Sequence, residues 1–220
     1  VGSFGGGPAT ERFGRRTVLT TGAALHAMGF VGLGLAPGWL AFVAFAVPAG
    51  WGAGTLDGGG NGLYLDLFRS GRGRAMNLLH LSFSLSALAA PLVVGALVDG
   101  GLAWPVILVG SAAAPLVLGF GFALVRMPSG RHRGVEGAEP PAGGRGRISL
   151  PLALLGIAIL AYVGSEVGVS NWIVRFLASA PLSTATLALS LFWGGLAVGR
   201  LVSAPIADRF DHVRFTAACS

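Results

Sequence analysis

The sequence predicts an all-α polytopic membrane protein with about six complete transmembrane helices. Hydrophobic residues make up 53% of its 220 residues and charged residues only 11%. A soluble domain usually carries about 25% charged residues. Five long windows contain no Asp, Glu, Lys or Arg, and they cover residues 17–56, 75–98, 100–125, 148–165 and 176–199.

The order of the predicted spans follows from these windows. Residues 17–56 are too many for one helix, and the turn dipeptide Pro37-Gly38 divides them. Because a span needs about 20 apolar residues, each remaining window supplies one helix. The predicted spans are residues 17–36, 39–65, 75–98, 104–125, 148–177 and 184–207.

The basic residues are concentrated in alternate loops. All 15 of them are Arg, and all but Arg175 lie in every second loop along the chain or toward the span end that adjoins it. By the positive-inside rule, we expect the Arg-rich loops to be cytoplasmic in a multi-pass protein of the plasma membrane. The net charge of +6 then reflects topology, and we expect a lipid bilayer rather than nucleic acid as partner.

A hydrophilic stretch at residues 127–147 divides the chain. Its Gly, Pro and Arg content cannot bury a core, which indicates a flexible cytoplasmic linker. The predicted domains are an N-terminal helical bundle at 1–126 and the start of a C-terminal bundle at 148–220.

Catalytic and metal chemistry are not expected. Cys219 is the one cysteine, so neither a disulfide framework nor a Cys-based metal site can form. No Gly-x-Ser-x-Gly or His-Glu-x-x-His pattern occurs. We therefore expect a monomeric protein that is not an enzyme and has no metal or cofactor.

Two turns, roughly 200 residues apart, share a pattern of Pro followed by acid-Arg-Phe. The first lies at residues 7–16 and the second at 204–213. A repeat at this distance indicates two homologous halves related by an axis along the membrane normal.

The first turn resembles the loop 2-3 signature of the major facilitator superfamily, G-x-L-A-D-R-x-G-R-K-x-x-L. Glu11 stands where Asp is usual and Ala9 replaces Leu, while the second turn keeps Asp208 and Arg209. The matching residues are Gly7, Arg12, Gly14, Arg15, Arg16 and Leu19.

The resemblance implies a two-bundle transporter fold in which the spans are numbers 3 to 8 of a chain about twice as long. We therefore expect the sequence to run from the end of span 2 to the start of span 9. The acid-Arg turn then acts as a conformational switch through helix-end contacts. The alternative is that its Arg residues only determine topology.

Ionisable side chains inside a span cost about 2.5 kcal/mol or more, so each is a candidate for function. Asp57 and Asn61 are four residues apart and share one face of a glycine-rich span. Asn77, His80 and Ser84 form a polar stripe on the next span. The alternatives are a close-packing helix for Asp57 and a neutral core histidine for His80.

These two spans resemble the fucose/glucose-type sugar:proton symporter branch of the superfamily. The resemblance implies that Asp57, Asn61, Asn77 and His80 line a sugar path. We expect His26, in the first span, to be structural.

The predicted fifth span carries a second candidate group. Glu166 lies mid-span, with Asn171 and Trp172 following it. Glu166 is a candidate proton carrier, and Trp172 is either a sugar-stacking residue or an interface anchor.

Together these features predict secondary active transport of a small solute, a sugar, by alternating access coupled to protons. The alternatives are a drug or other small-molecule exporter of the same superfamily, a sodium-coupled transporter or facilitator, and a non-transporting membrane scaffold. The Arg-x-x-x-Gly element expected of exporters is missing from the second predicted span.

Overall fold

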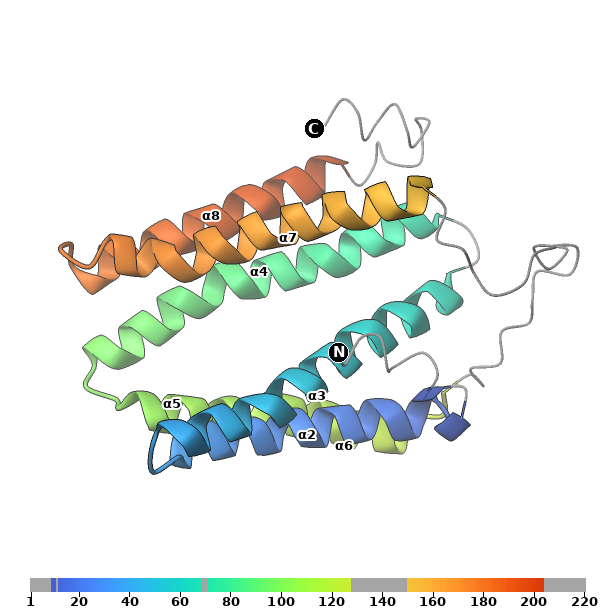
Figure 1. The fold of residues 1–220 in the computed structure, drawn as a ribbon, viewed down its shortest axis with the longest axis horizontal. Helices are drawn as coiled ribbons and strands as arrows, with labels where there is room; N and C mark the ends of the chain where they lie inside the picture. Colours follow the sequence, from blue (N-terminus) through green and yellow to red (C-terminus); the bar gives the residue numbers. More distant parts are fainter. Residues whose placement is uncertain (1–8, 11, 69–70, 128–149, 204–220) are drawn as a thin grey trace, which may run out of the picture.

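The computed structural model describes residues 9–10, 12–68, 71–127 and 150–203 (Figure 1). Within these ranges the regular structure is helical throughout, and six segments are long and apolar enough to cross a membrane. This confirms the all-α prediction. The helices are α2 (Arg15–Leu35), α3 (Trp39–Leu67), α4 (Arg72–Asp99), α5 (Trp104–Ser111), α6 (Ala113–Leu124), α7 (Leu150–Phe176) and α8 (Leu182–Ser203).

The fourth predicted span is interrupted. It consists of α5 and α6, which are separated at Ala112. Pro115 explains the break, because its ring nitrogen cannot donate to the carbonyl of Ser111 and its ring crowds that carbonyl. The two helices together still have the length of one span.

The helices form two groups (Figure 1). The first consists of α2, α3, α5 and α6, and the second of α4, α7 and α8. In the second group α8 packs along α4 and also contacts α7, while α3 and α4 touch over a short stretch. The predicted division into an N-terminal and a C-terminal bundle stays a prediction, and most of the predicted linker lies outside the described residues.

Glycine allows α2 and α3 to approach closely. A Cβ atom at Gly29 would overlap the backbone of Ala49, and one at Gly22 would lie 2.9 Å from the Thr55 side chain. His26 adds a polar link, since its Nδ1 lies 2.7 Å from the Ala49 carbonyl oxygen. Small residues and interhelical hydrogen bonds are the usual means of association between helices in lipid. His26 therefore has the structural contact expected of it.

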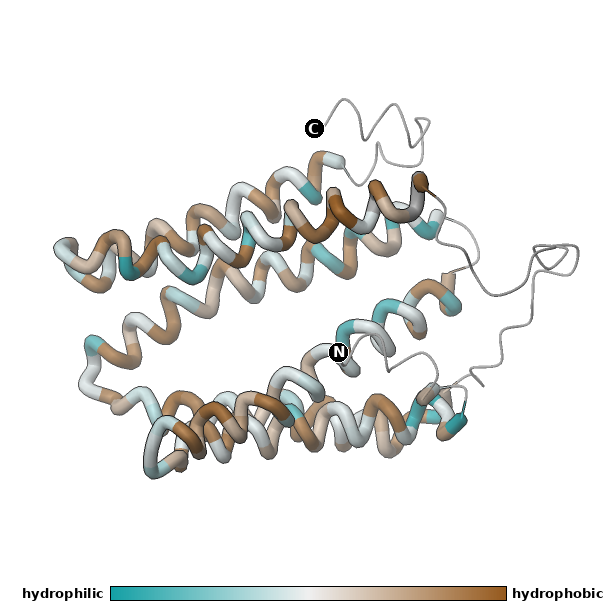
Figure 2. Tube along the Cα trace, in the orientation of Figure 1, coloured by the Kyte–Doolittle hydropathy of each residue, from teal (hydrophilic) through white to brown (hydrophobic). Residues whose placement is uncertain are grey.

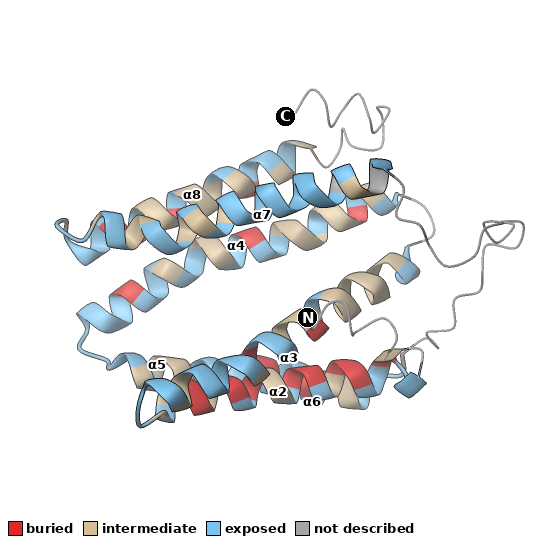
Figure 3. Ribbon diagram, viewed as in Figure 1, coloured by how far each residue is buried: buried red, intermediate tan, exposed pale blue. Residues whose placement is uncertain are grey.

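The surface of the helices is apolar. Figure 2 shows hydrophobic and neutral residues over most of each helix, with hydrophilic residues at the start of α2. Buried residues are concentrated in α2, whereas α7 is largely exposed (Figure 3). Leu160 and Phe176 of α7, for example, are 73% and 86% exposed. Lipid chains solvate such side chains without cost, so these faces suit a bilayer.

The helix ends that follow or precede Arg-rich segments lie together. The start of α2, the end of α3 and the start of α4 occur at one side of the molecule, as do the ends of α6 and α8 and the start of α7 (Figure 1). The short turns lie at the opposite side. We call the first side the Arg-rich end.

Candidate functional site

The start of α2 carries the described residues of the first acid-Arg turn that match the loop 2-3 signature. Gly14 precedes the helix with φ 81°, a backbone conformation that side-chain-bearing residues rarely adopt. This turn brings Arg15 to Asp66 at the end of α3, where the two side chains form an ion pair. Arg16 donates to the carbonyl oxygen of Ala123, near the end of α6.

These contacts tie three helix ends together. The guanidinium of Arg16 lies at the C-terminal end of a helix, where the helix dipole favours a positive charge. Arg15 is buried, whereas Asp66 is 40% exposed. Arg12 lies outside this cluster, with its guanidinium carbon 5.3 Å from the centroid of the Phe13 ring.

Asp66 is a site residue that sequence reasoning missed. The available signal was an acid that directly follows a predicted span and precedes the Arg residues of the next loop. The remaining predicted switch residues lie outside the described part of the chain: Gly7, Glu11, Asp208 and Arg209.

A groove that contains several polar side chains lies between α3 and α4. It has a cavity volume of about 320 Å³ and brings together Asp57, Asn61 and His80. The Asn61 amide donates to Asp57 Oδ1 at 3.1 Å, which is the contact that their spacing on one helix face allows. Phe83 supplies an aromatic wall.

Two serines, which sequence reasoning did not single out, also line the groove. Ser82 Oγ donates to the Leu79 carbonyl at 2.7 Å, and Ser86 Oγ donates to the Ser82 carbonyl at 3.0 Å. Because each hydroxyl uses its proton within α4, its lone pairs remain to accept hydrogen bonds from a ligand. Asn77 is half-buried on the same helix but does not line the groove.

The glycines around Asp57 have different surroundings. Gly59 meets the side chain of Leu19, and a Cβ at Gly52 would overlap the backbone of His26. Gly60 and Gly62 have open space where a Cβ would lie. Close packing therefore explains part of the glycine-rich segment, while Gly60, beside Asn61, lines the groove.

The second candidate acid lies outside this groove. Glu166 is half-buried on α7, one turn after Tyr162, and the Tyr162 phenol interacts with both Glu166 and Arg200 of α8. Asn171 and Trp172, nearer the end of α7, are exposed. The structure thus separates Glu166 from Asp57 and places neither Asn171 nor Trp172 at the groove.

Arg200 contacts α4 directly. Its Nη1 donates to the His80 carbonyl oxygen at 2.9 Å and to Ser84 Oγ. Ser84 is fully buried, and its own hydroxyl lies 3.1 Å from the same carbonyl. Sequence reasoning noted Arg200 only as a topology signal.

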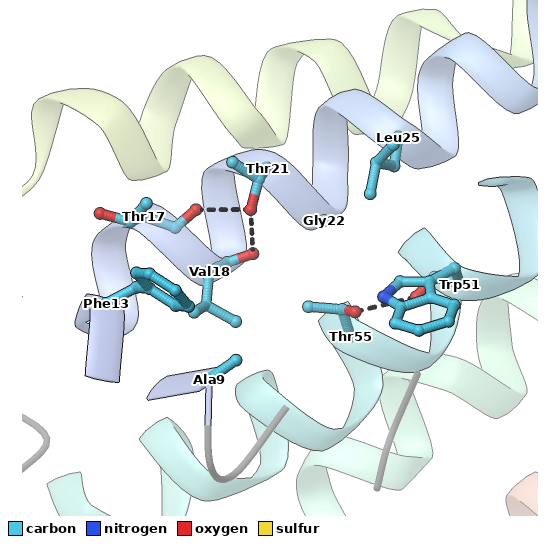
Figure 4. A pocket seen from close by; sticks show the side chains of 9 residues that line it. All are labelled: Ala9, Phe13, Thr17, Val18, Thr21, Gly22, Leu25, Trp51 and Thr55. Carbon is cyan, nitrogen blue, oxygen red and sulfur yellow. Dashed lines mark hydrogen bonds between the residues drawn. The ribbon is translucent and has the colours of Figure 1, made fainter. Parts of the chain in front are cut away.

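A further pocket of about 290 Å³ lies between α2 and α3 (Figure 4). Two of its hydroxyls are satisfied within their own helices, since Thr21 donates to the Thr17 and Val18 carbonyls and Thr55 donates to the Trp51 carbonyl. It contains no charged side chain. The groove at Asp57 is therefore the better candidate for binding a polar solute.

The comparisons with known proteins agree with this architecture. The family model described as Major Facilitator Superfamily matches residues 1–220. No curated protein and no solved structure matches the chain. Since the family model covers the whole chain, the protein belongs to the Major Facilitator Superfamily, whose members transport small solutes across membranes.

Proposed function

We propose that the chain takes part in proton-coupled transport of a sugar, and that the solute contacts the groove between α3 and α4. Family membership supports the transport of a small solute across a membrane. The observation that carries the finer proposal is the gathering of Asp57, Asn61 and His80 from two helices into one groove.

The groove has the chemistry that a polyhydroxylated solute needs. Asp57, Ser82 and Ser86 offer acceptors, the Asn61 amide retains a second N–H donor, and His80 offers a ring nitrogen. The Phe83 ring gives an apolar face on which the C–H side of a sugar ring can pack.

Asp57 and Glu166 are the proposed proton carriers. A carboxyl group gains a proton when it is desolvated and releases it when it is exposed or paired with a cation. Asp57 lies in the groove, and Glu166 lies one turn from Tyr162, whose phenol also interacts with Arg200 of α8. The two acids therefore occur on different helix groups that alternating access would move relative to each other.

Orientation in the membrane follows from the Arg-rich end. We propose that this end faces the cytoplasm of a plasma-membrane protein, since basic residues are retained on that side during insertion. We take the acting unit to be a monomer.

Equilibrium binding provides the first test. Detergent-purified protein is incubated with radiolabelled D-glucose and L-fucose, and the same sugars are used for uptake into proteoliposomes that contain a pH indicator. We expect saturable binding, uptake driven by an inward proton gradient, and acidification of the lumen that accompanies uptake.

Asp57→Asn should weaken sugar binding by about tenfold, because it removes the strongest acceptor in the groove. It should also abolish the accompanying pH change. Asp99→Asn is the matched control, since Asp99 is an exposed carboxylate at the opposite end of α4. Equal binding by the Asp57→Asn variant and the unmodified chain would contradict the proposed site.

A further inference from the structure

Asp57 carries a negative charge that the described residues do not balance. Its hydrogen-bond partner is the amide of Asn61, which has no charge. Within the described ranges the ion pair joins Arg15 to Asp66, and no described residue that lines the groove is Arg or Lys. A carboxylate inside a span is expensive unless a partner compensates it. The groove therefore has a negative charge that a bound cation would neutralise.

The other polar groups of the groove offer more acceptors than donors. Ser82 and Ser86 use their hydroxyl protons within α4, so both oxygens present lone pairs. Asn61 keeps one N–H beyond the one given to Asp57, and a neutral His80 ring provides one N–H and one acceptor. An ammonium group has three N–H donors and no acceptor, so it matches this set. A proton on Asp57 would balance the charge but would leave the serine lone pairs without donors.

An aromatic wall adds to the preference for a cation. Phe83 lines the groove and is 54% exposed. Its ring packs against Trp193 of α8, with centroids 5.6 Å apart and ring planes at 80°, so a neighbouring helix holds the wall in place. A cation within about 6 Å of an aromatic face is attracted by the ring quadrupole. The same ring can pack against the C–H groups of a sugar.

We propose that the solute recognised in this groove is an amino sugar, a polyhydroxylated ring that bears a protonated amine, and that Asp57 binds the ammonium group. Ser82 and Ser86 are the further acceptors available to it. A cavity of about 320 Å³ is at the lower end of the range for small-molecule sites, which suits a single sugar ring. This inference rests on the proposed function in taking the groove as the solute site, and it adds the amine.

The test is equilibrium binding to the purified full chain at pH 7 of three sugars that differ in one group. D-Glucosamine and 6-amino-6-deoxy-D-glucose each replace one hydroxyl of D-glucose with an amine. We expect at least one of them to bind about tenfold more tightly than D-glucose, because charge-assisted hydrogen bonds are about twice as strong as neutral ones. Asp57 is exposed in the groove, so raising the ionic strength from about 0.01 M to about 1 M should reduce this preference and leave D-glucose binding unchanged.

Variants locate the preference. Asp57→Asn should weaken amino-sugar binding by about a hundredfold, against about tenfold for D-glucose, so that the two sugars then bind equally. Asp99→Asn removes an exposed carboxylate at the opposite end of α4 and should keep the preference. Ser86→Ala removes one acceptor without changing the charge, and should weaken amino-sugar binding by about threefold.

The outcomes separate this inference from the proposed function. Amino sugars that bind no better than D-glucose, or a preference that survives Asp57→Asn or high salt, would overturn the inference. If D-glucose binding then still depends on Asp57, the sugar site stands without an amine. If an amino sugar binds through Asp57 and D-glucose does not bind, the inference stands and a neutral sugar is excluded. If the Asp57→Asn protein does not accumulate, the salt dependence of the unmodified chain decides the question.

Discussion

The ion pair between Arg15 and Asp66 predicts that removing one partner destabilises the protein more than removing the other. The Arg15 side chain is 8% exposed and the Asp66 side chain is 40% exposed. Asp66→Asn leaves a buried guanidinium without its counter-charge, whereas Arg15→Met removes the buried charge and leaves a carboxylate that water can reach. We expect Asp66→Asn to be the more destabilising change.

The magnitude follows from the burial of the two partners. Removing one partner of a fully buried pair costs about 3–5 kcal/mol, and a fully exposed pair contributes about 0–1 kcal/mol. Because Asp66 is partly solvated, we expect Asp66→Asn to cost about 2 kcal/mol. Arg15→Met should cost about 1 kcal/mol or less, since a methionine of similar length packs against the same neighbours.

The assay is reversible unfolding by SDS in mixed micelles, followed by the fluorescence of the five Trp residues. Asp99→Asn serves as the control for loss of an exposed carboxylate and should not change the free energy of unfolding. The double variant should be no less stable than Asp66→Asn alone. A larger cost for Arg15→Met than for Asp66→Asn, or strict additivity of the two changes, would refute this reasoning.

Two pairs of glycine substitutions test the backbone. Gly14→Ala should lower the free energy of unfolding by about 1–2 kcal/mol, because φ at this position is 81°. Gly38→Ala should change it little, because φ is an extended −177° and a Cβ has similarly open space. The same SDS titration measures both variants. Gly29→Ala should lower the midpoint of that titration because the new Cβ would overlap Ala49. Gly62→Ala, where a Cβ has open space, should leave the midpoint equal or raise it through the higher helix propensity of Ala. A destabilised Gly38→Ala or a stabilised Gly29→Ala would show that the structure misplaces these turns and contacts.

The spans were predictable because they depend on composition along the chain. A run of about 20 apolar residues must form a helix to satisfy its backbone in lipid, whatever its neighbours are. The same reasoning anticipated the contact between Asp57 and Asn61, since one turn of helix separates them. The break at Ala112 was foreseeable from Pro115, but only the structure shows that the helix is interrupted there rather than bent.

Contacts between distant residues were not predictable in the same way. Arg15 and Asp66 are 51 residues apart, and Arg200 and Ser84 are 116 apart. Their meeting depends on which helix faces pack together, and a hydropathy pattern that is apolar on every side does not specify those faces. The sequence showed that such charges needed partners, but not which partners they would find.

The polar stripe of α4 illustrates this limit and its consequence. Each residue turns a helix by about 100°, so Ser82 and Ser86 lie roughly 160° from Ser84 around the helix axis. Accordingly, Ser82 and Ser86 line the groove with α3, while Ser84 faces Arg200 of α8. His80 takes part on both sides, with its side chain at the groove and its carbonyl oxygen bound by Arg200. Because the groove wall and the contact with α8 are on two faces of one helix, a movement that separates α4 from α8 must also displace the wall that carries His80 and both serines.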